Sequence, residues 1–140
     1  MGRSHLASGV LSGAVVSTIA GLEPAHAVAF TGITAVCSLL PDFDHPDAIG
    51  PRYFGWPGRV FAWIIGSLFG HRGLTHSYLG MGILATGLAF IPHLPTLVIW
   101  AVLWGCATHI LGDMLTVSGV PLFWPLDQRF RLGRMRTGGF

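Results

Sequence analysis

Residues 94–117 read LPTLVIWAVLWGCATHILGDMLTV, and this stretch decides the fold. Asp113 is its only formally charged side chain, and its length falls within the ~17–25 apolar residues that cross a bilayer as a helix. The stretch therefore predicts a membrane-spanning helix. An ionisable side chain inside such a helix costs roughly 3 kcal/mol or more unless it is paired or ligated, so Asp113 needs a partner.

The rest of the chain has the same apolar character. Of the 140 residues, 51% are hydrophobic and 10% are charged, whereas a soluble domain carries about 25% charged residues. Further apolar stretches cover Leu6–Leu22, Ala25–Leu40 and Tyr78–Ile91, and a shorter one, Val60–Phe69, suits an interfacial or re-entrant helix. We therefore predict an all-α fold in a single integral membrane domain, 1–140. It is a polytopic helical bundle of about four transmembrane helices plus that short helix.

The arginines predict the orientation. The short connections Glu23–Pro24 and Pro92–His93 contain none, so every arginine falls on the other side of the bundle. Because basic loops stay in the cytoplasm, we expect a multi-pass protein of the cell (inner) membrane with both termini and residues 41–76 cytoplasmic. No recognition helix or aromatic platform accompanies the arginines, so no nucleic-acid partner is expected. The chain has no lysine, and its basic residues are Arg3, Arg52, Arg59, Arg72, Arg129, Arg131, Arg134 and Arg136.

The N-terminus has a second interpretation. Residues 1–27 resemble a secretory signal, with Arg3, an apolar run and the tripeptide Ala25-His26-Ala27. Cleavage would discard His5. The run is longer than the ~7–15 residues of a typical signal core and is interrupted by glycine and serine, which favours retention, but the sequence leaves both outcomes open.

Most histidines and aspartates fall into four groups along the chain. Under the predicted topology all four groups lie at the cytoplasmic ends of helices, so we expect them to converge there. The groups are His5; Asp42 and Asp44 with His45 and Asp47; His71 with His76; and His109 with Asp113.

His109 and Asp113 are spaced i, i+4. They therefore project from one helical face a single turn apart, and a helix can offer two ligands to one cation in this way. The alternative is a hydrogen-bonded His–Asp pair that joins two helices.

Asp42 and Asp44 follow Pro41, which ends an apolar run. In an extended turn an i, i+2 spacing aims both carboxylates the same way. Carboxylate and imidazole together suit Zn²⁺, Mn²⁺ or Fe²⁺ better than Ca²⁺, which prefers oxygen ligands. The alternative is a solvated acidic loop.

His71 and His76 are too far apart for one helical face, so Gly73 suggests a loop that turns both imidazoles inward. Arg72 offers the planar fork that binds phosphate or carboxylate oxygens, although plain membrane anchoring explains it equally well. Thr75 is a candidate cap for the following helix.

The remaining polar residues are expected outside the cluster. His26 and His93 lie in the arginine-free hairpins and are not expected to be ligands. Asp47 and Asp127 are expected at the surface, and His45 stays undecided between the surface and a position just behind the ligands.

Four motifs occur in order: Leu-Pro-Asp-Phe-Asp-His-Pro at 40–46, His-Arg-Gly-Leu-Thr-His-Ser at 71–77, His-x-x-x-Asp-x-x-Thr at 109–116 and Gly-Val-Pro-Leu-Phe-Trp-Pro at 119–125. In this set the chain resembles the YdjM-like family of predicted membrane-bound metal-dependent hydrolases, which is distantly similar to zinc-dependent phospholipase C. The resemblance covers nearly the whole chain. It implies metal ligation by His5, Asp42, Asp44, His71, His76, His109 and Asp113.

The resulting hypothesis is a membrane-embedded, phospholipase-like metal-dependent hydrolase. One or two divalent ions, zinc first and manganese or iron next, would activate water against a phosphoester or lipid-linked substrate reached from the membrane lipid. Arg72 would steady the anion, and Asp44 or Asp47 would serve as general base. The alternatives are a metal or ion transporter and a non-catalytic, metal-stabilised membrane scaffold.

Overall fold

The computed structural model describes residues 2–135, and its regular structure there consists of helices with two isolated β-bridges. The prediction of an all-α fold is confirmed. The elements are α1 (Gly2–Ile19), α2 (Pro24–Cys37), the 3-10 helix η1 (Pro41–Asp44), α3 (Ile49–Tyr53), α4 (Gly55–Phe69), the 3-10 helix η2 (Leu74–His76), α5 (Tyr78–Ala89) and α6 (Thr96–Met114).

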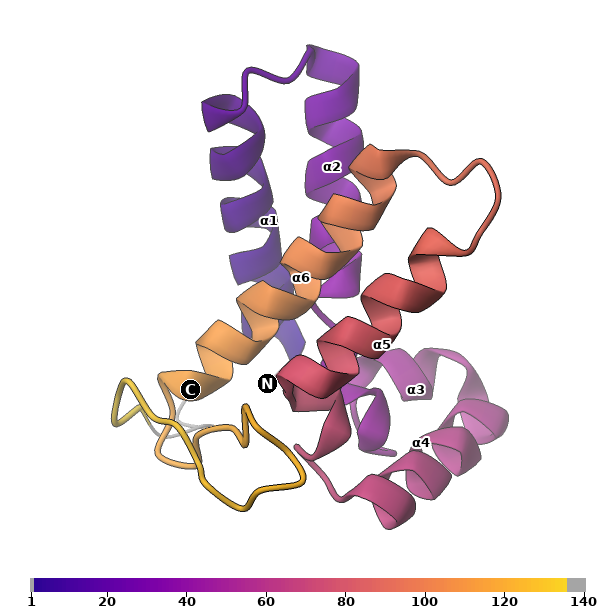
Figure 1. Ribbon diagram of the computed structural model, residues 1–140, viewed down its shortest axis with the longest axis vertical. Helices are drawn as coiled ribbons and strands as arrows, with labels where there is room; N and C mark the ends of the chain where they lie inside the picture. Colours follow the sequence, from indigo (N-terminus) through magenta and orange to yellow (C-terminus); the bar gives the residue numbers. More distant parts are fainter. Residues whose placement is uncertain (1, 136–140) are drawn as a thin grey trace.

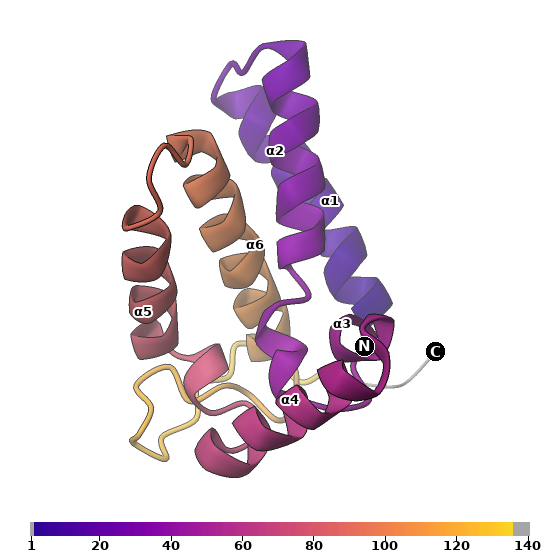
Figure 2. The same ribbon diagram turned by 90° about the vertical axis from the view of Figure 1, so that its right-hand side faces the viewer.

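Two helical hairpins form the upper part of the molecule. α1 and α2 form one, α5 and α6 the other, and α2 and α1 both pack against α6. Both hairpin turns lie at the same end, while α3, α4 and the segment after α6 gather at the other end (Figures 1 and 2). Figure 2 shows α4 crossing beneath the upright helices. The end of the bundle that carries the predicted site is therefore closed by short elements.

Within the described part of the chain, two segments, Pro24–Asp44 and Thr96–Met114, are long and apolar enough to cross a membrane. The 12-residue α5 extends only about 18 Å at 1.5 Å per residue, which is less than the ~30 Å hydrocarbon core. The number of four transmembrane helices therefore stays a prediction. The boundaries differ from the predicted stretches by a few residues at each end, as fraying helix ends usually do.

The first helix buries small and polar residues and exposes large apolar ones. His5, Gly9, Gly13 and Ser17 form its buried stripe, whereas Ile19 is 81% exposed. A helix in water would show the reverse pattern, because its apolar stripe faces the core. In lipid, small residues let helices approach closely while large apolar ones face the tails.

Glycines set the distances between helices. A Cβ on Gly9 would lie 2.9 Å from the Cα of Ala35, so α1 and α2 touch through backbone there. On α6, a Cβ on Gly105 would lie 2.5 Å from the carbonyl oxygen of Thr34 and 2.9 Å from the amide nitrogen of Ser38. The close approach at Gly105 brings the next turn of α6, which carries His109, against the end of α2.

The short apolar piece is a helix, as predicted, but α4 begins at Gly55 rather than Val60. Ala62 is its one fully buried residue, and Trp63 is 64% exposed. A Cβ on Gly66 would collide with the carbonyl oxygen of Asp44, so α4 passes directly beneath η1. The five-residue α3 was not predicted, because a helix that short shows no apolar periodicity.

The segment after α6 folds back beneath the bundle. Bridges pair Thr116 with Met135 and Val120 with Phe130. Val120 and Leu122 pack on Ile110 of α6 in a small apolar core. The carbonyl oxygen of Leu122 accepts a hydrogen bond from the Tyr78 amide, which ties this segment to the start of α5.

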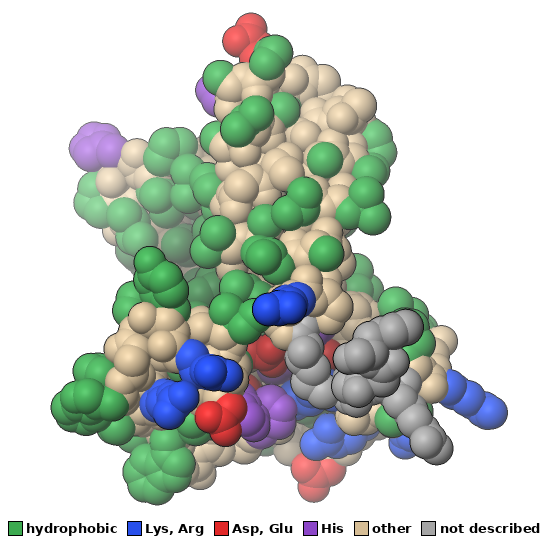
Figure 3. Space-filling model, turned by 180° about the vertical axis from the view of Figure 1, so that it is seen from behind, with side chains coloured by type: hydrophobic (Ala, Val, Ile, Leu, Met, Phe, Trp, Pro, Cys, Tyr) green, Lys and Arg blue, Asp and Glu red, His purple; other side chains and the backbone are tan. Residues whose placement is uncertain are grey.

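Charged side chains are concentrated at the end opposite the hairpin turns. Figure 3 shows hydrophobic side chains over the hairpins and most of the visible charges below them. Arg72 is buried, and Arg136 lies outside the described residues. The exposed arginines are Arg3, Arg52, Arg59, Arg129, Arg131 and Arg134.

Candidate metal centre

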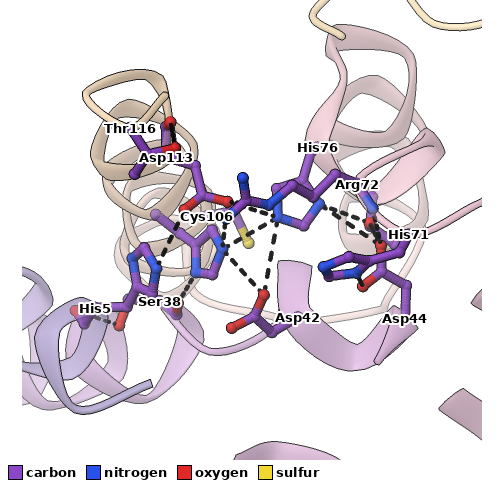
Figure 4. Close-up of polar contacts among 12 residues, drawn as sticks. His5, Ser38, Asp42, Asp44, His71, Arg72, His76, Cys106, Asp113 and Thr116 are labelled. Carbon is purple, nitrogen blue, oxygen red and sulfur yellow. Dashed lines mark hydrogen bonds and ion pairs between the residues drawn. The ribbon is translucent and has the colours of Figure 1, made fainter. Parts of the chain in front are cut away.

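The four predicted groups meet at the lower end of the bundle. Figure 4 shows His5, Asp42, His76 and Asp113 converging from α1, η1, η2 and α6. His76, His109 and Asp113 are fully buried, each with 0% exposure. The cluster is therefore a closed polar site within an otherwise apolar bundle.

His109 is oriented by the end of α2. Its Nδ1 donates to the carbonyl oxygen of Ser38 at 2.6 Å. A neutral imidazole has one N–H, so this bond fixes the proton on Nδ1 and leaves a lone pair on Nε2. Backbone contacts of this kind commonly orient histidine ligands of metals.

His76 is oriented by a relay through Thr75. The Thr75 hydroxyl donates to Oδ2 of Asp44 at 2.7 Å, and its oxygen lies 2.9 Å from Nδ1 of His76. Because that hydroxyl has one proton and gives it to Asp44, Nδ1 of His76 is the donor in the second bond. Burial lowers the pKa of His76, so the ring is neutral with a lone pair on Nε2.

The two Nε2 atoms face each other at 3.1 Å. Oδ2 of Asp113 lies 3.4 Å from Nε2 of His76 and 3.8 Å from Nε2 of His109. Neither oxygen of Asp113 makes a hydrogen bond in the described structure. Three buried atoms with lone pairs thus converge, and the two facing imidazole nitrogens repel each other when no cation lies between them.

Asp42 and His5 complete the surroundings. Oδ1 of Asp42 lies 3.5 Å from Nε2 of His109 and 4.0 Å from that of His76. Nε2 of His5 lies 3.4 Å from Oδ1 of Asp113, and the His5 ring stacks on His109 with centroids 3.7 Å apart. Among residues 2–135, two groups have potential ligand atoms within 4.8 Å of one another: His76, His109 and Asp113, and His5, Asp42 and His109.

These separations fit a transition metal. Two ligands bound ~2.0–2.1 Å from a tetrahedral zinc lie roughly 3.3 Å apart, and the three separations among His76, His109 and Asp113 run from 3.1 to 3.8 Å. Two imidazoles with a carboxylate are a common zinc donor set. Since Nδ1 of His109 is engaged with Ser38, its Nε2 can serve only one ion, and Asp42 and His5 remain for the same ion or a neighbouring one.

Asp44 lies apart from these two groups. Its Oδ1 accepts from Nδ1 of His71 at 2.9 Å, and its Oδ2 accepts from the Arg72 amide and from Thr75. The prediction that Asp42 and Asp44 lie in an extended turn is wrong, because residues 41–44 form a 3-10 helix. With three residues per turn, positions i and i+2 point in different directions, so Asp42 and Asp44 diverge. It stays a prediction that Asp44 and His71 bind metal. The general-base role of Asp44 or Asp47 also stays a prediction.

His71 and Arg72 both bond Asp44, and the His71 ring reaches the surface of the protein. The hydrogen bond to Asp44 raises the pKa of His71, whose side chain is 45% exposed. Arg72 has a φ of +58°, a left-handed conformation rare for residues other than glycine. Nε of Arg72 lies 2.9 Å from Oδ2 of Asp113, close enough for an ion pair although the angle makes no hydrogen bond. Arg72 is thus buried beside the candidate ligand Asp113, and its anion-binding role stays a prediction.

Sequence reasoning missed two contributors. Ser38 supplies the carbonyl that orients His109, and no side-chain pattern reveals a backbone acceptor. Thr75 bridges His76 and Asp44, whereas Ser77 caps α5, its hydroxyl accepting from the Gly80 amide. The prediction that Thr75 caps this helix is therefore wrong; Ser77, which directly precedes the helix, was the signal that could have found the cap.

The other polar residues lie outside the cluster. His26, His93, Asp47 and Asp127 are exposed. His45 accepts a hydrogen bond from the Asp47 amide, and its ring packs edge-to-face with that of His71, with centroids 4.9 Å apart. It therefore lies behind His71 and not among the converging atoms.

Comparison with known proteins gives consistent matches. The sequence profile of the YdjM inner membrane protein family matches residues 1–139. Proteins named inner membrane protein YdjM, from Escherichia coli (strain K12) and Shigella flexneri, are each 42% identical over 98 residues, which cover 67% of this chain and 48% of theirs. The protein YvsG of Bacillus subtilis (strain 168) is 34% identical over 143 residues, covering 99% of this chain and 82% of its own. The chain thus spans about half the length of the first two relatives. No solved structure gives a significant match.

Proposed function

Because this chain belongs to the YdjM inner membrane protein family, we propose that it acts at the inner membrane as a metal-dependent hydrolase of phosphoester or lipid-linked substrates. The family membership agrees with the resemblance seen in the motifs. The hydrolase activity is our inference from the site.

One observation carries this proposal: the Nε2 atoms of His76 and His109 face each other 3.1 Å apart, and the Asp113 carboxylate beside them makes no hydrogen bond to the described residues. Both rings are held by partners on their far side, through Ser38 and Thr75. A site whose ligands are oriented in this way suits binding of a divalent cation, because little rearrangement is needed.

His76, His109 and Asp113 would hold the metal, with Asp42 and His5 adjacent. A divalent metal bound by these residues would supply Lewis-acid chemistry, activating water for attack and polarising a phosphoryl oxygen. The buried Arg72 places a fixed positive charge at Asp113, within reach of the same centre, where it would stabilise an anionic substrate.

His71 is the candidate for proton transfer. Its Nδ1 donates to Asp44, which leaves Nε2 of this half-exposed ring available to a substrate. A carboxylate behind an imidazole holds the ring in one tautomer and stabilises its charged form. Asp44, with both oxygens engaged by donors of its own chain, would act as a positioning residue for His71, Arg72 and Thr75.

The position of the site argues against transport. Transporters place their ion sites near the middle of the bilayer between structural repeats. Here the cluster lies at one end of the bundle, beside α4 and the segment after α6 (Figures 1 and 2). A site at a membrane boundary suits a reaction on a headgroup.

The proposal is tested by metal analysis of the detergent-purified protein together with a screen of phosphodiester and phospholipid substrates. We expect bound zinc, manganese or iron and metal-dependent turnover in the wild type, and loss of both in Asp113→Asn. Asp47→Asn, at an exposed carboxylate, is the matched control. A metal-free wild type that takes up no added ion would exclude the metal centre. A metal-loaded protein without turnover on any substrate would support a scaffold instead.

A further inference from the structure

A cavity of about 430 Å³ lies directly behind the metal centre. It is bounded by η1, α4 and α5 and reaches α6 at Cys106. Its volume falls within the ~300–1,000 Å³ typical of ligand sites. Apart from the Thr75 hydroxyl, the side chains that line it are apolar, among them Leu40, Phe43, Phe61, Ile65, Met81 and Ile83.

The cavity opens toward the outside of the bundle. Ile83 on α5 is 58% exposed and Phe61 on α4 is 54% exposed, so both stand at its rim. α5 packs on α6 and η2 but buries none of its residues completely. Under the predicted topology α5 and α6 lie in the membrane, and this opening would then face the acyl region of the bilayer.

The inner wall of the cavity is shared with the candidate site. Thr75 lines the cavity and also bonds His76 and Asp44. Leu40 and Pro41 directly precede Asp42, and Cys106 lies one helical turn before His109. A molecule with an alkyl end in the cavity would therefore have its polar end close to the His/Asp cluster and Arg72.

We propose that this cavity holds one acyl chain of a membrane phospholipid whose phosphate reaches the metal centre. The identification of that lipid as the substrate rests on the proposed hydrolase function. A bound peptide would require hydrogen-bond partners for its backbone, and the lining offers one hydroxyl. An alkyl chain needs none, and the charge of Arg72 complements a phosphate at the opposite end.

The proposed role of the cavity is to orient the lipid and not to raise its affinity for the protein. Lipid tails are as apolar as the lining, so a chain that moves from the bilayer into the cavity gains little from the hydrophobic effect. The position of the chain instead determines which bond of the headgroup lies near the ligands. Blocking the cavity should therefore reduce turnover of long-chain substrates and spare that of a water-soluble phosphodiester.

Photolabelling tests the occupant directly. The probe is a phosphatidylglycerol that carries a diazirine midway along one acyl chain, incorporated into phosphatidylcholine vesicles with the full chain. Labelled peptides are located by mass spectrometry. Ile83→Trp fills the cavity from its rim, and Leu79→Trp, at a 48% exposed position one turn away that does not line the cavity, is the matched control.

We expect the label to concentrate on α4 and α5 in the wild type and in Leu79→Trp, and to be lost from both helices in Ile83→Trp. The same pattern is expected after metal removal with EDTA, because the cavity is apolar. Uniform labelling of the bundle, undiminished labelling of Ile83→Trp, or protection of α5 by a second copy of the chain would overturn the proposal.

The outcomes separate the two proposals. Cavity labelling without turnover of any substrate would contradict the hydrolase function and leave the lipid site intact. Turnover with uniform labelling would contradict the acyl-chain site alone. If both hold, Ile83→Trp should lower kcat/KM for the phospholipid and leave that for bis(4-nitrophenyl) phosphate unchanged.

Discussion

Nε of Arg72 lies 2.9 Å from Oδ2 of Asp113, and this contact joins the loop before α5 to the last turn of α6. Both side chains are almost fully buried, with 7% and 1% exposure. Asp113 has histidines on its other sides, so Arg72 is its permanently charged counterion. The position of Asp113, a candidate metal ligand on α6, therefore depends on the conformation of the loop that carries Arg72.

Removal of Arg72 should destabilise the metal-free protein. Arg72→Ala leaves a buried carboxylate without its counterion, and loss of one partner of a buried pair costs about 3–5 kcal/mol. The measurement is the free energy of unfolding in mixed micelles with EDTA present. Added zinc should restore part of the loss, since the ion neutralises Asp113. Arg59→Ala, at an exposed arginine, should have little effect. Equal stabilities of the two variants would contradict the role given to the pair.

Thr75 should control metal affinity without touching the metal. Thr75→Val removes the hydroxyl that accepts from His76 and donates to Asp44. Loss of a residue that orients a metal ligand typically lowers metal affinity about 10–100-fold. Thr75→Ser keeps the hydroxyl and should retain most of the affinity. The measurement is zinc affinity by competition with a chromophoric chelator. An unchanged affinity in Thr75→Val would show that the relay does not orient His76.

His71 should make the stability of the metal-free protein depend on pH. The hydrogen bond to Asp44 raises the pKa of His71 above its ordinary 6.5, so the folded protein binds this proton more tightly than the unfolded chain does. The resulting stabilisation is fully present below pH 6.5 and is lost as the pH rises through the raised pKa. We expect unfolding with EDTA to become easier in that window, and His71→Gln to remove this dependence. An identical pH profile in both proteins would contradict the assignment.

The close contact between α1 and α2 should tolerate no side chain at Gly9. A Cβ there meets the backbone of Ala35, which cannot move aside, so Gly9→Leu should cost about 1–3 kcal/mol or more through overpacking. Gly32→Leu is the matched control, because its Cβ meets nothing within 4 Å. Thermal unfolding in detergent compares the two. Destabilisation of equal size in both variants would show that the contact does not hold the helices together.

The arginine pattern predicts the topology, and cysteine labelling tests it. In a background with both native cysteines replaced, a cysteine at Glu23 or His93 should react with a membrane-impermeant maleimide added to intact cells. A cysteine at Arg59 or Asp127 should react only after the cells are opened. All four positions are exposed. Labelling of Arg59 or Asp127 positions in intact cells would reverse the proposed orientation.

The order of apolar stretches, the arginine-free hairpins and the shared face of His109 and Asp113 follow from the sequence alone. Each depends on local rules: the length of a span, the placement of basic loops, and the 3.6-residue period of a helix. The sequence also predicts that the four polar groups converge, because all of them lie at the cytoplasmic ends of the predicted helices.

Only the tertiary structure decided which of these residues face one another. Asp42 and Asp44 separate because residues 41–44 form a 3-10 turn. His109 takes its tautomer from Ser38 because Gly105 lets α6 approach the end of α2. Arg72 turns inward to Asp113 because a left-handed residue redirects the loop. These arrangements depend on contacts between segments far apart in the chain, and local sequence periodicity carries no information about such contacts.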